Sequence, residues 1–380
     1  MDSVRDLTYQ CLERWTERLD KDEYRLFWEG NYYDSDVHDY AELTNDTLKI
    51  LVSKCINVLI KLDVKKHTKV AVYLPALIQL PVITLAAHRI GAKLLITSAI
   101  DEDAEQLGAL LKEFDPEIII TVDGFWCGSK LKQSKCIIDK ALSCYQSSCR
   151  HVIVIRHVTP NEGVPPPQKH FTAKRPYYLY KISMEEGRDL WWSDLFANVQ
   201  SSSSSLSLND CELIGEISAK TDIMYQAKWF CFESLVCLRN EDGQLSVIGI
   251  THHQLEDKIK RLAKLIDASG MCFVMNSQDP FTATIAMLAT LYSSAQLLIF
   301  EGVSSYPDYS RISQIINKYQ IQTLIIANND LQDVLNNDEY AKMWNTETLS
   351  KLIVFGDKDT ANRAGKLFGV QSESISLSPE

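Results

Sequence analysis

The sequence lacks the dense clusters of basic residues that a nucleic-acid-binding surface needs. Its 380 residues carry 39 Lys and Arg against 50 Asp and Glu, which gives a formal net charge of −11. Proteins that bind a phosphate backbone gather Lys and Arg on one surface. We therefore expect no nucleic acid among its partners, and we interpret the acidity as a property that keeps the chain soluble.

Cysteine and histidine spacing typical of metal sites is also missing. The ten cysteines contain no Cys-x-x-Cys pair, and the two histidines of the only His-His pair, His252 and His253, are adjacent. Neighbouring residues on a helix do not face the same direction, so this pair does not favour a metal ion. We predict no metal site, and buried reduced thiols in place of disulfides.

No segment has the features of a secretory leader or of a membrane span. Residues 1–15 are charged and lack an apolar stretch. The apolar run 70–87 is interrupted by Pro75, Gln79 and Pro81, which a strand followed by a buried helix explains better than a transmembrane helix. We expect no membrane span and a cytoplasmic location, with the nucleus left open as a second compartment.

Short apolar runs rich in β-branched residues alternate with amphipathic stretches. The predicted strands are 69–74, 94–98, 117–121, 151–156, 271–275, 296–300, 323–327 and 351–355. The predicted helices are 43–61, 77–90, 101–113, 136–145, 253–266, 281–294, 310–319, 329–336 and 359–368. Strands that are apolar on both faces and separated by helices indicate an α/β fold with mainly parallel sheets. Asp101 and Asn329 are the predicted N-caps of their helices.

A serine-rich run, 200–210, interrupts this alternation. Its composition is typical of a flexible linker, and a phosphorylated regulatory segment is the alternative. The run divides the chain into an N-terminal arm with a first α/β block, 1–199, and a second α/β block, 211–380. The aromatic stretch Leu26–Trp28 is interpreted as part of the extended arm.

The stretch 235–253 carries a turn signal but lacks a phosphate-binding signal. Asp242-Gly243 lies between two apolar runs, which predicts a β-hairpin. A phosphate-binding loop would need several glycines, hydroxyl side chains and a Lys or Arg. This turn has one glycine, two acids and no lysine, so it does not favour phosphate binding.

A series of motifs in consistent order resembles the AMP-forming acyl-CoA synthetases, and the acetyl-CoA synthetases in particular. The first is the stretch 69–92, in which a strand ends at Pro75 and a helix ends in Arg-Ile-Gly-Ala. The further motifs are Asp-Gly at 123–124, IDKAL at 138–142, HVIVIRH at 151–157, DLWWSDL at 189–195, FEGV at 300–303 and YPD at 306–308. The resemblance extends over about 35–360. It implies part of the N-terminal domain of the adenylate-forming fold.

Members of this family join a carboxylate to ATP, which forms an acyl-adenylate and pyrophosphate, and CoA then displaces AMP. The resemblance therefore implies ATP, Mg and CoA as the family's cofactors. The family's adenine and metal motif, its ribose-binding Asp and its mobile C-terminal domain with a catalytic Lys have no counterpart up to residue 380. We expect a truncated second block without that mobile domain, and we assign no catalytic residue.

The family's phosphate loop, Y-T-S-G-S-T-G-x-P-K-G, overlays best on residues 239–252. Gly243 falls where the family has Ser, and Ile248 replaces its Lys, whereas Gly249 and His252 fit the pattern. The two acids of the turn would repel phosphate instead of binding it.

The family's CoA-binding pattern, an Arg followed by Gly-Gly-Lys, becomes Cys127-Gly128-Ser129-Lys130 in this chain. Replacing Arg by Cys127 removes a charge and its hydrogen-bond donors. We therefore interpret four residues as degenerate remnants of the CoA and phosphate sites: Gly128, Lys130, Gly243 and Gly249.

The family's acyl pocket, G-W-V-T-G-H, falls near residues 278–283. The Trp that would close off acetate is absent, and Asp279 would place one carboxylate near another, which is unfavourable at low dielectric. Of the family's T-A-P-T turn only Ala327 is retained, and the G-E-P stretch begins at Gly356.

Three hypotheses follow from these losses. The leading one is a non-catalytic pseudoenzyme that binds no cofactor and acts through protein interaction, with a full-length acyl-CoA synthetase or another protein as its partner. The second is an acetate-type acyl-CoA ligase fragment or isoform that retains some nucleotide binding. The third is a remnant of a gene without a selected function.

Overall fold

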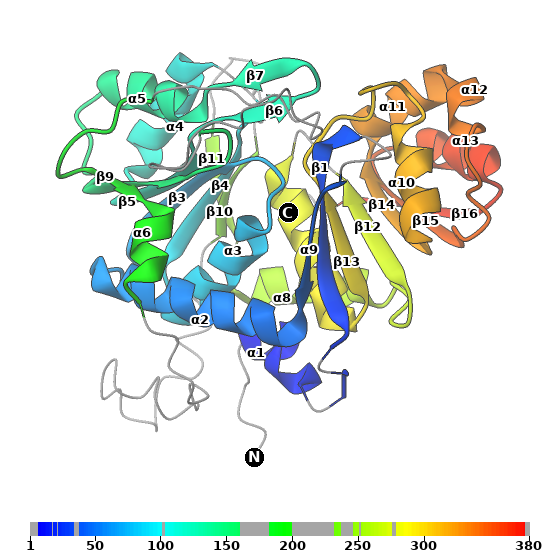
Figure 1. Ribbon diagram of the computed structural model, residues 1–380, viewed down its shortest axis with the longest axis horizontal. Helices are drawn as coiled ribbons and strands as arrows, with labels where there is room; N and C mark the ends of the chain where they lie inside the picture. The colour runs from blue at the N-terminus through cyan, green and yellow to red at the C-terminus, as the bar shows by residue number, and fades with distance from the viewer. Residues whose placement is uncertain are drawn as a thin grey trace, which may run out of the picture.

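The computed structural model describes most of the chain and confirms the predicted α/β fold (Figure 1). The described residues are 7–16, 18–20, 22–33, 38–100, 103–159, 182–199, 232–236, 246–250, 252–275 and 279–376. They form two seven-stranded sheets and one small hairpin.

The first sheet has the order β11-β10-β4-β3-β5-β8-β9. Its strands are β3 (Lys69–Leu74), β4 (Lys93–Ser98), β5 (Ile118–Val122), β8 (His151–Ile155), β9 (Asp189–Trp191), β10 (Phe232–Val236) and β11 (Ser246–Ile250). All neighbours are parallel except β10 and β11, which pair antiparallel with Val236 opposite Ser246. The strands of the predicted hairpin are therefore confirmed, and its turn at Asp242-Gly243 lies outside the described residues.

The second sheet has the order β16-β15-β14-β12-β13-β1-β2. Its strands are β1 (Tyr24–Tyr33), β2 (His38–Thr44), β12 (Met271–Met275), β13 (Gln296–Phe300), β14 (Thr323–Ala327), β15 (Lys351–Phe355) and β16 (Gln371–Ile375). Only β1 and β2 pair antiparallel. A separate hairpin joins β6 (Phe125–Cys127) to β7 (Lys130–Lys132).

Helices lie between the two sheets and on their outer faces (Figure 1). The central helices are α3 (Gln79–Ile90), α8 (His252–Ala263) and α9 (Pro280–Ser293). The remaining α-helices are α1 (Leu7–Cys11), α2 (Asn45–Lys61), α4 (Ala104–Phe114), α5 (Ser134–Ser143), α6 (Trp192–Ala197), α10 (Arg311–Tyr319), α11 (Asn328–Asn336), α12 (Asp338–Ala341) and α13 (Lys358–Phe368). Residues 281–291 of α9 are all buried, as expected for a helix that is apolar on every side.

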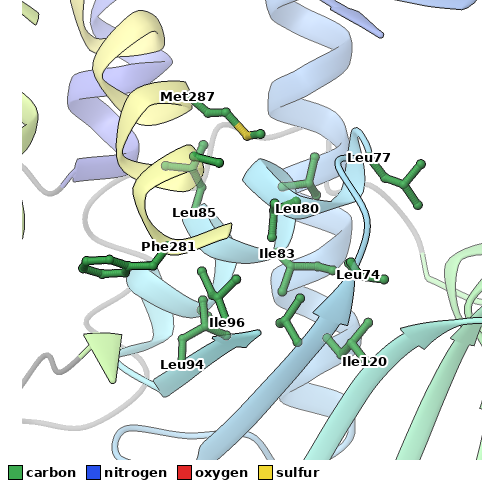
Figure 2. Packing of buried hydrophobic residues seen from close by; sticks show 14 of the residues in the cluster. Leu74, Leu77, Leu80, Ile83, Leu85, Leu94, Ile96, Ile120, Phe281 and Met287 are labelled. Carbon is green, nitrogen blue, oxygen red and sulfur yellow. The ribbon is translucent and has the colours of Figure 1, made fainter. Parts of the chain in front are cut away.

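The main hydrophobic core joins the two sheets through these central helices. It contains Ile96 of β4, Ile299 of β13 and Leu288 of α9, all at most 2% exposed. Figure 2 shows Met287 of α9 pointing towards the Leu80 and Leu85 side chains of α3. A second cluster packs α10, α11 and α13 against the outer face of the second sheet.

All eight predicted strands are found within one or two residues, because each is a short apolar run that is buried on both faces. Neither of the two predicted N-caps is found at its predicted position. Asp103, with the N–H groups of Glu105 and Gln106 donating to its carboxylate, caps α4, whereas Asp101 lies outside the described residues. Asn329 lies inside α11, because the helix begins directly after β14 and its N-cap is Ala327.

The predicted N-terminal arm is largely strand β1, which lies inside the second sheet between β13 and β2. Arg25 on β1 donates to the carbonyl oxygens of Leu291, Ser294 and Ala295 at the end of α9. Burial lowers the pKa of this guanidinium to about 10. The contact adds a charged donor to carbonyls at and just after the end of α9, where the helix itself offers few N–H partners.

Further along β1, the buried Glu29 carboxylate accepts hydrogen bonds from three side chains of α10. Its donors are Arg311 at 2.8 Å, Lys318 at 2.7 Å and Tyr319 at 2.6 Å. Burial, followed by the nearby Glu29 charge, raises the pKa of the Tyr319 hydroxyl. Charged groups of this kind are stable in a core only when they are paired, so the cluster fixes α10 against β1.

Strands from both sides of the serine run contribute to each sheet. β1 and β2 pair next to β13, and β10 pairs parallel with β4. Residues 200–210 lie outside the described residues, and the boundaries 1–199 and 211–380 stay a prediction.

Candidate functional site

The candidate site lies where the carboxyl ends of strands from both sheets meet. Ligands of open α/β sheets bind at this end of the strands. A cavity of about 30 Å³ is lined there by residues at the ends of β3, β4, β12 and β13 and by the start of α9. One water molecule needs about 10–15 Å³ of such a cavity, so this cavity has room for about two water molecules.

The lining of this cavity is mainly apolar. Its apolar side chains include Leu74, Leu80, Met275, Met287 and Phe300. In the view of Figure 2, Leu80 of α3 lies between Met287 of α9 and Leu74 at the end of β3. Among the described residues that line it, only Glu301 has a charged side chain, and Ser98 adds a hydroxyl group.

Glu301 follows β13 directly and is held by a histidine from the other half of the molecule. The Nε2–H of His157 donates to Glu301 Oε1 at 2.7 Å, and the Glu301 side chain is 2% exposed. The second oxygen, Oε2, is buried and has no hydrogen-bond partner among the described residues. The ring of Trp28 packs edge-on against His157, with centroids 6.1 Å apart.

The loop that carries His157 is organised by Asp123, which lies at the end of β5 and is fully buried. Its carboxylate accepts hydrogen bonds from the backbone N–H groups of Gly124, His157, Val158 and Thr159. A carboxylate with four such donors needs no cation nearby. The Asp-Gly motif at 123–124 therefore positions His157 towards the cavity.

Asp279 acts as a helix cap in this structure. Its Oδ1 accepts from the N–H groups of Phe281 and Thr282, at 3.1 and 3.2 Å, and Oδ2 accepts from the Thr282 hydroxyl. These N–H groups are the ones that would otherwise attract an anion at a helix N-terminus. The start of α9 is therefore not free to bind a phosphate or a carboxylate through them.

The predicted CoA remnants have separate environments. Gly128, at φ +60°, sits in the turn between β6 and β7, and the buried Asn31 side chain binds both its N–H and its carbonyl, at 2.9 and 2.8 Å. A Cβ on Gly128 would contact Val303 and Tyr306 of the loop after β13. Lys130 is exposed on β7. The CoA role of Gly128 and Lys130 stays a prediction.

The predicted phosphate-loop remnants are only partly described. Gly249 lies in β11, opposite Glu233 of β10, and Gly243 lies outside the described residues. At the ends of β14 and β15, Gly356 approaches Asn328 so closely that a Cβ would lie 2.5 Å from the Asn328 Cβ. The roles of Gly243 and Gly249 in phosphate binding stay a prediction.

Sequence reasoning missed the pairing of His157 with Glu301 and the clamp of Asn31 on Gly128. Both residues of the first pair lie in motifs that carried the resemblance, HVIVIRH and FEGV. Their distance of 144 residues along the chain hides the contact. The sequence did carry a signal for Glu301, because a charged residue directly after a buried parallel strand lies at the edge of the sheet where ligands bind.

Among the residues that the structure describes, no group of three or more His, Cys, Asp or Glu side chains is arranged to hold a metal ion. His253 instead pairs with Asp257 one turn along α8, at 3.0 Å. No helix in the described ranges is long and apolar enough to cross a membrane.

Comparison with known proteins confirms the resemblance to the AMP-forming acyl-CoA synthetases. Residues 22–187 match the family described as AMP-binding enzyme. Over 326 residues the chain is 26% identical to the acetyl-coenzyme A synthetase of Streptomyces avermitilis, covering 86% of this chain and 44% of that protein. It is 24% identical over 346 residues to the chloroplastic/glyoxysomal acetyl-coenzyme A synthetase of Arabidopsis thaliana, covering 88% and 41%.

The match to an acetyl-coenzyme A synthetase of Nostoc linckia has a different coverage. It is 24% identical over 343 residues and covers 89% of this chain and 88% of that protein. Against the Streptomyces and Arabidopsis relatives, the chain spans less than half of their length.

Proposed function

We propose that this acetyl-CoA synthetase-like chain is non-catalytic and acts by binding another protein. The observation that carries the proposal is the cavity at the strand ends, which offers about 30 Å³ and one charged group, a carboxylate. Pockets that bind drug-sized ligands occupy about 300–1,000 Å³. A nucleotide triphosphate does not fit this space.

The charges around the cavity also oppose phosphate binding. Adenylation needs cationic groups and N–H donors directed at the transferring phosphate. Here Glu301 lines the cavity, and Asp279 already accepts the first N–H groups of α9. The residues present therefore do not fit ATP with Mg at this position, and we expect no cofactor.

Support for a protein partner comes from the edges of the second sheet. Within the described residues, β2 and β16 each pair with one neighbour only. An edge strand offers unpaired N–H and C=O groups to a further strand. On β2, Tyr40 is 43% exposed, and aromatic side chains are common anchors of protein interfaces. We infer that a full-length acyl-CoA synthetase adds to this edge.

Catalysis is tested with the purified chain, ATP, Mg, acetate and CoA. We expect no acetate-dependent pyrophosphate release under conditions in which a competent acetyl-CoA synthetase turns over. Calorimetry with ATP tests the alternative function, a ligase fragment with residual nucleotide binding. Pyrophosphate release, or saturable ATP binding at millimolar concentration, would count against the non-catalytic proposal.

The interaction is tested by sedimentation of the chain mixed with a full-length acetyl-CoA synthetase. Tyr40→Lys places a charge on the edge strand and should weaken the complex about tenfold, the change expected for loss of one aromatic anchor. Ile50→Lys is the matched control, because Ile50 is 48% exposed on α2. Equal loss in both variants, or no complex with the unmodified chain, would refute this interface.

A further inference from the structure

A second cavity, the α2–α6 cavity, lies between the end of α2 and the segment that contains β9 and α6. It has a volume of about 250 Å³ and opens to solvent. An engineered cavity of about 150 Å³ is large enough to bind benzene, so by proportion this one has room for about ten non-hydrogen atoms. The α2–α6 cavity is therefore large enough for a small organic molecule.

One wall of this cavity is a single face of α6 and of the residues that flank it. The lining residues on this face follow the spacing i, i+3, i+4, i+7 and i+8, and they are Trp191, Asp194, Leu195, Asn198 and Val199. Side chains at this spacing point in the same direction from a helix. Val58 of α2 and Leu190 of β9 add to the apolar part of the wall.

Two oppositely charged and exposed side chains belong to this wall, those of Lys61 and Asp194. The Lys61 ammonium, at the end of α2, donates to the carbonyl oxygen of Asn198 at 3.0 Å and has further N–H donors. Asp194 lies one helical turn before Asn198, about 5.4 Å along the axis. Its carboxylate accepts from the Ser193 hydroxyl at 3.1 Å and can accept more than one such bond. A cation and an anion therefore lie about one turn apart beside the opening.

Two other polar side chains of the wall have partners within the chain. The side chain of Asp189 is 0% exposed and pairs with Lys135 and Arg188. The side-chain N–H of Asn198 donates to the carbonyl oxygen of Asp194 at 2.9 Å, which leaves the amide oxygen of Asn198 as an acceptor. Lys61 and Asp194 therefore determine which charges a ligand must carry.

We propose that the α2–α6 cavity binds an α-amino acid with a large apolar side chain, of the size of phenylalanine. The carboxylate of the ligand pairs with Lys61 and its ammonium group pairs with Asp194. The benzyl group packs against the apolar wall, and its seven carbon atoms fit within the room for about ten. Trp191 adds an aromatic surface, and aromatic pairs attract each other beyond the area that they bury. Arg156 covers one face of the Trp191 ring, 3.8 Å from its centre, so the ligand contacts the other face or the edge.

A ligand with only one charge fits this wall less well. A carboxylate without an amine brings a negative charge close to Asp194, and an amine without a carboxylate brings a positive charge close to Lys61. A partly exposed ion pair contributes up to about fivefold in affinity. Only a zwitterion gains both pairs.

This inference does not depend on the proposed function. The residues that line the α2–α6 cavity differ from those that line the cavity at the strand ends, and none of them belongs to the edge strand β2. Failure of the amino-acid site would leave the pyrophosphate and sedimentation tests unaffected.

The test is a titration of the full chain with L-phenylalanine, followed by saturation-transfer NMR of the ligand protons. We expect a Kd of about 1 mM, as for a small ligand that stays partly exposed. Phenylpropionate, which lacks the amine, and phenethylamine, which lacks the carboxylate, should each bind about fivefold more weakly. L-alanine lacks the ring and should give no saturable signal up to about 20 mM. Absence of saturable phenylalanine binding, or alanine binding as tightly, would refute the proposal.

Two variants assign the two charges. Lys61→Gln should weaken the binding of phenylalanine and of phenylpropionate about fivefold, and should not weaken that of phenethylamine. Asp194→Asn should weaken the binding of phenylalanine and of phenethylamine about fivefold, and should not weaken that of phenylpropionate.

The matched controls are Lys342→Gln and Asp338→Asn, which change the net charge by the same amounts. These residues form an exposed ion pair on α12, and both controls should leave all three affinities unchanged. Circular dichroism and thermal unfolding establish that the four variants are folded. A loss that is equal for all three ligands in a folded Lys61→Gln or Asp194→Asn chain would overturn the assignment of the charges.

Discussion

At the scale of single residues, the molecule depends on buried charges that are paired across distant segments. Glu29 with α10 is one cluster, and Lys135 with Asp189 is another. Lys135 Nζ lies 2.7 Å from both Asp139 and Asp189, and Arg188 contacts the same two carboxylates. Asp139 belongs to the motif IDKAL and Asp189 to the motif DLWWSDL, so the two motifs meet in space through these contacts and join α5 to β9.

Asp189 provides a prediction for the dependence of stability on pH. Burial by itself would raise the pKa of this carboxyl, but hydrogen bonds from Arg188 and Lys135 lower it below its ordinary value. A lowered pKa in the folded state stabilises the protein above the unfolded value, about 3.9. This stabilisation is lost as the pH falls from there through the folded pKa.

We therefore expect Asp189→Asn to lower the free energy of unfolding at pH 7 by about 2 kcal/mol, because Lys135 and Arg188 lose one of the two carboxylates that they share and keep only the more exposed Asp139 in common. The difference from the unmodified chain should shrink below about pH 4. Urea denaturation at a series of pH values measures both effects. Asp194→Asn, at an exposed position of α6, serves as the control. A difference that stays constant down to pH 3 would contradict this account.

At the scale of elements, α9 is the helix on which the cavity depends. It is buried along its length, and its N-cap, Asp279, lies next to Pro280 of the cavity wall. Asp279→Ala should lower the free energy of unfolding by about 1 kcal/mol through loss of the cap. It also frees the N–H groups of Phe281 and Thr282. Denaturant titration checks the first effect.

The matched control for this helix is Asp103→Ala, which removes a similar cap from α4. Both variants should lose stability to a similar extent, about 1 kcal/mol. Asp279→Ala should then raise the affinity for acetate more than Asp103→Ala does, because the N–H groups that it frees lie beside the cavity, whereas those at the start of α4 belong to the exposed residues Glu105 and Gln106. Unchanged acetate binding in a folded Asp279→Ala chain would show that the cap does not exclude anions.

The elements also show what the sequence could predict and what it could not. Strands such as 271–275 and 323–327 were predictable because each is apolar on both faces and matches the buried strand found there. The position of β1 in the second sheet was not predictable, because its pairing with β13 joins residues about 270 positions apart in the sequence. Local patterns carry no information on such partners.

In the candidate site, too, local features were predictable from the sequence and long-range contacts were not. Gly128, Asp279 and Glu301 all belong to stretches that the family pattern identified. The cap at Asp279 is a local contact, but the clamp of Asn31 on Gly128 and the contact of His157 with Glu301 depend on how separate segments meet. Sequence could therefore locate the strand ends that form the site, but the chemistry of its cavity required the structure.

At the scale of the whole molecule, one core connects both sheets. Leu94 and Ile96 of β4 and Leu297 of β13 belong to the same buried cluster, with α9 between the sheets. Elements that share a core lose their packing together when it opens. We therefore expect β4 and β13 to unfold in one cooperative step, although each lies in a different sheet.

Leu288→Ala tests this coupling, since Leu288 is fully buried on α9. Loss of a buried leucine side chain should lower the free energy of unfolding by about 2–5 kcal/mol. Native-state hydrogen exchange should show the same decrease for amides of β4 and of β13, whereas Ile50→Ala at an exposed position should change neither by more than about 0.5 kcal/mol. A decrease confined to one sheet would mean that the two sheets unfold independently, and the cavity between them could then open without global unfolding.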